Sequence, residues 1–250
     1  MLIDAHVHLT DDELFELKEH VFTMLDNLDI IALSVSMDLE TSKRNLLLRS
    51  KKVLPFIGIH PWADYENLDN FIDFTMENKD RIYGIGEIGL DKKYVKDEEG
   101  YSKQKVIFKA MLDIAEKYRK PISVHTRASL DDVLDILSSY KLSVLLHWFS
   151  GSKKQLKIAN DRGYYVSFGP ALLYASDKPH LLLNSDKDLV LTETDGPVRY
   201  PRCFEGRMAL PSYLVSVVYA MANILNMEYD EVCIMLENNA KRYLSIDTIK

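Results

Sequence analysis

Residues 121–147 read PISVHTRASLDDVLDILSSYKLSVLLH, and this stretch contains one complete strand–helix–strand unit. The segments Pro121–His125 and Leu142–His147 are short and mostly apolar, as expected for strands that are covered on both faces. Between them, the apolar residues of Leu130–Tyr140 recur at helical spacing. Strands joined through a helix run parallel, with a right-handed crossover, so this unit predicts an α/β fold.

The same alternation continues on both sides of this unit. Short apolar runs at intervals of roughly thirty residues predict eight strands: Leu2–Val7, Ile30–Ser36, Val53–Ile59, Ile82–Ile88, Pro121–His125, Leu142–His147, Tyr164–Phe168 and Leu189–Thr194. Further helices are expected at Ser102–Arg119, Ser212–Asn226 and Tyr229–Arg242, with an irregular stretch at Gly196–Pro211. Eight such units in about 250 residues are typical of a (β/α)₈ TIM barrel. We therefore predict a single barrel domain over residues 1–250.

The composition is that of an ordinary globular protein, with 47% hydrophobic and 28% charged residues. The net charge of −7 argues against a protein that holds nucleic acid through a broadly basic surface, although a local phosphate contact remains compatible with it. Cys203 and Cys233 have no metal-ligand spacing, and no stretch has the length or flanks of a membrane span or signal peptide. We expect a cytoplasmic protein.

Histidine and acidic residues stand at the carboxyl ends of six of the eight predicted strands. These residues are His6, His8, His60, Glu87, His125, His147 and Asp195. In a parallel barrel the carboxyl ends of the strands open on one face, where barrel active sites are built. His6 and His8 alternate along one strand, so both imidazoles are expected to face the barrel mouth.

A single His-x-His pair is more often structural than functional, but the whole set favours metal binding. The imidazoles of His6, His8, His125 and His147 and the carboxylates of Glu87 and Asp195 exceed what one tetrahedral ion can use. The ligand count therefore predicts two divalent ions, with Glu87 or Asp195 as the bridge. Mixed nitrogen and oxygen ligands suit zinc, manganese or iron, and imidazole disfavours magnesium without excluding it, so Zn, Mn and Mg stay open.

Six blocks of the chain resemble, in order, the signature blocks of the TatD family of metal-dependent deoxyribonucleases, in the amidohydrolase superfamily. The blocks are His6-Val7-His8, Gly58–Pro61, Gly86–Asp91, Pro121–Arg127, His147–Gly151 and Thr192–Pro197. The resemblance implies a TIM barrel, divalent metals and hydrolysis of phosphodiester bonds in DNA, often exonucleolytically, by a water that two metals activate.

The resemblance also assigns roles to individual residues. It makes His6, His8, Glu87 and Asp195 ligands of one metal ion, with Glu87 bridging to a second ion. His125 and His147 hold that second ion, and His60 touches substrate phosphate beside the site.

The chain departs from the family pattern at three of these blocks, as an archaeal or otherwise divergent branch would. Trp62 stands where the family commonly has a second His, Ala128 where it has an acidic residue, and Trp148 where it has Cys. None of these changes removes an expected metal ligand. They leave the substrate open.

As a hypothesis, Asp195 orients or deprotonates the attacking water, Glu87 bridges the ions, and His60 stabilises or protonates the leaving oxygen. Substrate contacts are expected from His60 and Arg127, and from Trp62 and Tyr94, whose rings can stack unpaired bases. The alternative for His60 is a residue beside Pro61 without a catalytic role. Asp91 and Glu193 are expected either to support the ligands from behind or to be structural, with side chains that point away from the site.

Two other functions remain open. The same constellation suits an amidohydrolase that acts on a small cyclic amide or ester, and a barrel that binds metal without catalysis is a third possibility. The Gly58–Pro61 and Gly86–Asp91 blocks favour the nuclease. The expected partner is DNA, single-stranded or with frayed ends, and no membrane or obligate protein partner is inferred.

Overall fold

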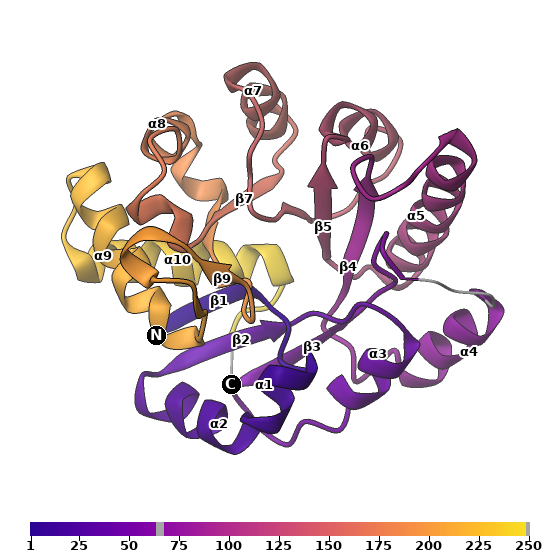
Figure 1. Ribbon diagram of the computed structural model, residues 1–250, viewed down its shortest axis with the longest axis horizontal. Helices are drawn as coiled ribbons and strands as arrows, with labels where there is room; N and C mark the ends of the chain where they lie inside the picture. The colour runs from indigo at the N-terminus through magenta and orange to yellow at the C-terminus, as the bar shows by residue number, and fades with distance from the viewer. Residues whose placement is uncertain (64–67, 249–250) are drawn as a thin grey trace.

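The computed structural model describes residues 1–63 and 68–248, and their main feature is a parallel sheet of eight strands in sequence order. The strands are β1 (Leu2–Val7), β2 (Ile30–Ser34), β3 (Val53–Ile57), β4 (Gly84–Asp91), β5 (Ile122–Arg127), β6 (Val144–Leu146), β7 (Tyr165–Phe168) and β8 (Val190–Thr192). Every neighbouring pair from β1 to β8 is parallel. Figure 1 shows the helices around the outside of these strands. The predicted (β/α)₈ fold is confirmed.

The helices follow the strands as the alternation predicts. They are α1 (Asp12–Glu16), α2 (Lys18–Asn27), α3 (Leu39–Asn45), α4 (Leu68–Asn78), α5 (Glu98–Tyr118), α6 (Leu130–Leu137), α7 (Lys153–Asp161), α8 (Lys178–Asn184), α9 (Leu214–Leu225) and α10 (Tyr229–Leu244). Helix α5 begins four residues before the predicted start at Ser102, because the Asp97 side chain caps it and accepts the Gly100 N–H.

The stretch Gly196–Pro211, expected to be irregular, contains a short antiparallel hairpin, and the prediction is wrong there. Its strands are β9 (Arg199–Tyr200) and β10 (Arg207–Met208). Short 3₁₀ segments flank or connect these and other elements: η1 (Pro170–Leu173), η2 (Lys187–Leu189), η3 (Arg202–Phe204) and η4 (Pro211–Tyr213). Two-residue strands are too short to show periodicity in a sequence.

The barrel closes between β8 and β1 through isolated hydrogen bonds instead of a regular ladder among the described residues. The Asp195 N–H donates to the His6 carbonyl at 2.9 Å, and the His8 N–H donates to the Gly196 carbonyl at 2.8 Å. Both bonds lie at the carboxyl ends of the strands. They place the segment after β8 directly beside the His-x-His segment of β1.

Helix α10 covers the opposite end of the barrel, where the strands begin. Its Tyr243 is fully buried and stacks on Phe56 of β3 and against Tyr165, the first residue of β7. The strands β3 and β7 lie across the barrel from one another in the sheet order, so Tyr243 fills the space between them. In Figure 1 the yellow C-terminal helices lie beside the indigo strand β1, so the last helices of the chain pack against its first strand. The carboxyl ends of the strands are left as the open face.

Candidate metal centre and substrate pocket

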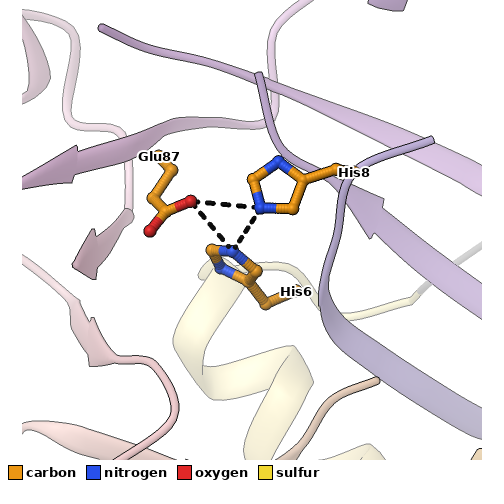
Figure 2. A group of neighbouring side chains, drawn as sticks. All are labelled: His6, His8 and Glu87. Atoms are coloured by element: carbon orange, nitrogen blue, oxygen red, sulfur yellow. Dashed lines mark hydrogen bonds and ion pairs between the residues drawn. The ribbon is translucent and has the colours of Figure 1, made fainter. Parts of the chain in front are cut away.

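The two histidines of β1 converge on one carboxylate from β4. The Nε2 atoms of His6 and His8 lie 3.3 Å apart, and each is within 3.2 to 3.3 Å of Glu87 Oε2. Figure 2 shows both imidazole rings turned toward the same Glu87 oxygen. Alternation along the strand therefore brings the pair to one face, as the sequence predicts.

Glu87 also contacts three further imidazoles through its other oxygen. Oε1 lies 2.8 Å from His147 Nε2, 2.9 Å from His125 Nδ1 and 3.3 Å from His60 Nε2. The five histidines come from the ends of β1, β3, β5 and β6 or from the residues that follow, so one buried carboxylate joins four parts of the barrel.

A glycine in the neighbouring segment gives Glu87 the room it needs. A Cβ at Gly58, just after β3, would lie 2.6 Å from the Glu87 carbonyl oxygen. The segment after β3 can approach β4 this closely only because residue 58 has no side chain. This explains the glycine two residues before His60.

Asp195 supplies a second carboxylate to the same centre. Its Oδ1 lies 3.4 Å from His8 Nε2 and 3.6 Å from His6 Nε2. The residue has a φ of 51°, a left-handed conformation that Asp tolerates better than most residues, at the sharp turn after β8. The turn directs the Asp195 carboxylate back over β1.

Burial and neighbouring charges shift the pKa values of this cluster in opposite directions. Burial lowers the pKa of His6 to about 4, with the His147 charge adding to the effect. For His8, burial is outweighed by the hydrogen bonds to Asp195 and Glu87, which raise its pKa to about 10. The surrounding imidazoles of His60, His147 and His6 overcome burial and hold the pKa of Glu87 well below its usual range. Glu87 is thus an anion that is surrounded by nitrogen ligands.

The donor set and its spacing fit divalent cations. Three groups have ligand atoms within 4.8 Å of one another: His6, His8 and Glu87; His6, His147 and Asp195; and His60, Glu87 and His125. Ligands about 2.1 Å from a tetrahedral ion are separated by about 3.4 Å, which is close to the 3.2 to 3.3 Å that separates the His6, His8 and Glu87 atoms. Imidazole and carboxylate are the ligands of zinc and manganese sites.

Polar side chains lie behind two of these rings. Ser123 Oγ lies 2.7 Å from His6 Nδ1, which turns Nε2 of that ring toward Glu87. Glu193 is buried, accepts hydrogen bonds from the Trp148 N–H and the Ser167 hydroxyl, and lies 3.7 Å from His147 Nδ1. Such partners fix the orientation of metal-binding histidines.

The expectation that Asp91 and Glu193 point away from the site is wrong, whereas a role in supporting the ligands from behind agrees with their contacts. Glu193 faces the back of His147, and Asp91 Oδ2 lies 3.0 Å from His125 Nε2. Asp91 follows Glu87 by four residues and Glu193 precedes Asp195 by two, so strand alternation itself places each pair on a common side. A register shift between Ile85 and Ile88 further alters how β4 meets β5.

A cavity of about 480 Å³ opens above the cluster. Its lining includes the predicted residues His60, Trp62 and Arg127 together with His8, Glu87, His125, His147 and Asp195. Tyr94 lies one ring further out, half-exposed and stacked on Trp62 with 5.6 Å between ring centroids. The sequence interpretation did not assign Met37, Pro197, Val198 or Trp148 to this cavity, and all four line it. Pro197 and Val198 lie between β8 and β9, and Trp148 has a positive φ of 43° after β6. None of the three belongs to a strand or helix whose periodicity could reveal it.

Few cations surround this mouth. Arg127 is the one Lys or Arg among the described residues that line the cavity, and its Nε donates to Asp91. Arg199 and Lys92, which follow β8 and β4, form ion pairs with Glu13 and Asp132. Any phosphate contact at this mouth is therefore local.

The chain is similar in sequence to several known proteins. The family model described as TatD related DNase matches residues 3–245. The chain is 29% identical over 245 residues to the metal-dependent hydrolase MJ1582 of Methanocaldococcus jannaschii, covering 96% of each chain. It is 24% identical over 217 residues to the deoxyribonuclease TATDN3 of Homo sapiens, covering 80% of this chain and 79% of the human protein.

A solved structure supports the fold at lower sequence identity. The crystal structure of YJJV, a TatD homologue from Escherichia coli, superposes with a TM-score of 0.91 at 22% identity and covers 98% of each chain. Within the described part of the chain, none of the helices has the length and apolar character needed to cross a membrane.

Proposed function

The chain belongs to the TatD-related DNase family, and its relatives include a metal-dependent hydrolase. On this basis we propose that it hydrolyses phosphodiester bonds in DNA with two divalent metal ions. The observation that carries the proposal is Glu87, a buried carboxylate in contact with five imidazoles at the open end of the barrel. In this proposal His6, His8, Glu87 and Asp195 hold one ion. Glu87, His125 and His147 hold the other.

Two divalent cations at this centre would supply a nucleophilic water at neutral pH and offset the charge that develops on the attacked phosphate. Asp195 is the proposed acceptor of the proton from that water. Its carboxylate is at the rim of the cluster and lines the cavity, so it reaches both the ligand side and the substrate side.

His60 is proposed to act on substrate rather than as a metal ligand. Its Nδ1 accepts the Trp62 backbone N–H at 3.1 Å, so in the neutral ring the hydrogen sits on Nε2, which faces the centre. Burial lowers the pKa of His60 and keeps the ring neutral. An Nε2–H donates a hydrogen bond to a phosphate or leaving oxygen and has no lone pair for an ion.

The rim of the cavity supports a nucleic acid with unpaired bases. Trp62 and Tyr94 form a stacked pair at the mouth, and the Arg127 guanidinium lies 5.1 Å from the Trp62 ring centre. A stacked base and one neighbouring phosphate are the chemistry that these groups fit. A strand end that enters a cavity of about 480 Å³ accords with exonucleolytic cleavage of single-stranded or frayed DNA.

The name of one relative, the human deoxyribonuclease TATDN3, also supports DNA as the substrate. We further propose that the protein acts in the cytoplasm as a single barrel domain over residues 1–250, a span that includes residues 64–67 and 249–250 outside the described part. The two cysteines, Cys203 and Cys233, are free, as suits a reducing compartment.

The decisive experiment is a hydrolysis assay with the purified full chain. The metal-stripped protein, reloaded with Mg²⁺, Mn²⁺ or Zn²⁺, is incubated with single-stranded DNA, duplex DNA with blunt or frayed ends, and a panel of small cyclic amides and esters. Metal-dependent release of nucleotides from single-stranded ends is the expected result. Turnover confined to the amide and ester panel would replace the nuclease with an amidohydrolase, and the absence of any turnover would leave a metal-binding barrel without catalysis.

A further inference from the structure

Asp91 is a fully buried carboxylate that three side chains from two segments approach together. Its Oδ2 accepts the indole N–H of Trp62 at 2.6 Å and the Nε–H of Arg127 at 2.9 Å, and it lies 3.0 Å from His125 Nε2. Its Oδ1 accepts the backbone N–H groups of Lys93 and Tyr94 at 2.9 and 3.1 Å. A buried carboxylate with this many donors is fixed in one orientation.

The first consequence concerns the His125 ring. Its two nitrogens face two carboxylates, since Nδ1 lies 2.9 Å from Glu87 Oε1 and Nε2 lies 3.0 Å from Asp91 Oδ2. A ring that donates its Nε2–H to Asp91 has its Nδ1 lone pair directed at the Glu87 side, where the metal centre is proposed. This is the carboxylate–histidine–metal arrangement that sets the tautomer and angle of a ligand.

The second consequence concerns the aromatic pair at the mouth. Trp62 stacks on Tyr94, and Asp91 binds the indole of the former and the backbone of the latter. Arg127 reaches over the Trp62 ring while its Nε is bound to the same carboxylate. One carboxylate therefore holds the two rings and the cation that face substrate.

We propose that Asp91 is a positioning residue that aligns the His125 ligand and the Trp62–Tyr94 rings with one another. The proposal rests on the proposed function, in which the rings receive a base while the neighbouring phosphate reaches the metal centre. Asp91 itself touches neither substrate nor metal. Its effect on the ions is exerted through His125, and its effect on the bound strand through Trp62 and Tyr94.

Gln104 contacts the same two segments without using the Asp91 carboxylate, which makes the role testable. The Asp91 backbone N–H is bound by Gln104 Oε1 from α5 at 2.9 Å, and Gln104 Nε2 donates to the Pro61 carbonyl at 2.9 Å. Gln104 thus ties the segment that carries Trp62 to the end of β4 without using the carboxylate. The isosteric Asp91→Asn variant is expected to fold.

The test compares Asp91→Asn with two other variants in the full-length protein. Trp62→Phe keeps an aromatic ring but removes the pyrrole part of the indole, and with it the N–H that Asp91 accepts. Asp97→Asn removes one negative charge from the same β4–α5 segment, where Asp97 is exposed and caps α5, and serves as the matched control. Three quantities are measured: Mn²⁺ affinity by calorimetry, the imidazole ¹⁵N resonances of His125 in the metal-free protein, and KM and kcat with a single-stranded oligonucleotide.

Asp91→Asn is expected to weaken one of the Mn²⁺ binding events about 10- to 100-fold and to shift the His125 nitrogen resonances, while Asp97→Asn changes neither. Trp62→Phe is expected to raise KM about 5-fold with Mn²⁺ affinity unchanged. Wild-type Mn²⁺ affinity and unshifted His125 resonances in Asp91→Asn would overturn the proposal, as would an unchanged KM in Trp62→Phe.

The metal and resonance measurements do not require turnover. If the wild-type protein cleaves no DNA, the proposed function fails while these two readouts still decide the effect of Asp91 on His125. If Asp91→Asn does not fold, Trp62→Phe remains informative, because an unchanged KM in that variant overturns the link between Asp91 and the rings.

Discussion

The carboxylate of Asp4 in β1 accepts hydrogen bonds from both the backbone N–H and the side-chain hydroxyl of Thr194, at 2.9 and 2.5 Å. The two residues meet at the junction where β1 and β8 have no regular ladder among the described residues. Both residues lie close in sequence to a proposed metal ligand, since His6 follows Asp4 by two residues and Asp195 directly follows Thr194. The contact therefore fixes the relative position of two strands that together supply one metal site.

Asp4 gives the metal-free protein a predictable dependence of stability on pH. Burial, together with the Glu193 charge, raises the pKa of Asp4 from its usual 3.8 to about 8. The folded chain then binds this proton more tightly than the unfolded chain, so the stability that the proton contributes is present below pH 3.8 and is lost as the pH rises to about 8. Asp4→Asn, which cannot ionise, is expected to avoid this loss.

The measurement is thermal unfolding of chelator-treated protein between pH 5 and pH 8. The difference between the melting temperature of Asp4→Asn and that of the wild type should increase in favour of the variant by about 5 °C or more from pH 5 to pH 8. Asp186→Asn, at an exposed 3₁₀ cap, is the control, and its curve should parallel that of the wild type. Parallel curves for Asp4→Asn and the wild type would contradict the assignment.

Substitution of the two central carboxylates should separate metal binding from proton transfer. Glu87→Gln removes the charge that contacts five imidazoles, so we expect it to abolish tight binding of both ions together with hydrolysis. Asp195→Asn should lower kcat by about 10² to 10⁴, the usual contribution of a general base. Metal content is measured by mass spectrometry, and Asp161→Asn, exposed on α7, is the control. Full activity in both variants would refute the mechanism.

Removal of metal should destabilise the fold as well as stop turnover. The ions bind the folded state only, so a concentration of about 100 times Kd adds about 2.7 kcal/mol of stability. For a chain of this length that corresponds to about 5 to 10 °C in melting temperature. Dialysis against a chelator should produce this drop, and Mn²⁺ should reverse it. In Glu87→Gln the chelator should have no effect, and an equal drop in that variant would point to ions bound elsewhere.

The outer ring of the aromatic pair should contribute to substrate affinity and leave the chemical step intact. Tyr94 is 52% exposed and stacks on Trp62, and stacking of one base is worth about 1 to 3 kcal/mol. Tyr94→Ala should therefore raise KM for single-stranded DNA about 10-fold with kcat within a factor of about 2. Tyr83→Ala, exposed just before β4 at the opposite end of the barrel, is the control. An unchanged KM for Tyr94→Ala would exclude the pair from base stacking.

Binding of DNA should depend only weakly on salt. The chain has a net charge of −7, and Arg127 is the one Lys or Arg among the described residues that line the cavity. For single strands the slope of log K against log salt is about −0.7 per phosphate contact, so two or three contacts give a slope of about −2. Fluorescence anisotropy with a phosphorothioate oligonucleotide measures this slope. A slope steeper than about −5 would indicate an extended basic surface instead.

The barrel, and the end of it that carries the site, follow from the amino-acid sequence without further information. Apolar runs alternating with helical segments predict parallel strands, and the structure has all eight, including the short seventh strand Tyr165–Phe168. The position of a residue at a strand end is a local property, which is why the strand pattern is enough to assign His6, His8 and Glu87 to the open face.

Which groups meet at that face depends on the tertiary fold. Asp4 and Thr194 are 190 residues apart, and their contact exists only because the barrel closes between β1 and β8. Asp91 turns toward His125 and Trp62 because of how the segments after β3, β4 and β5 pack at the mouth. Sequence periodicity gives the direction of a side chain relative to its own strand, whereas these partners depend on register, closure and the path of the loops.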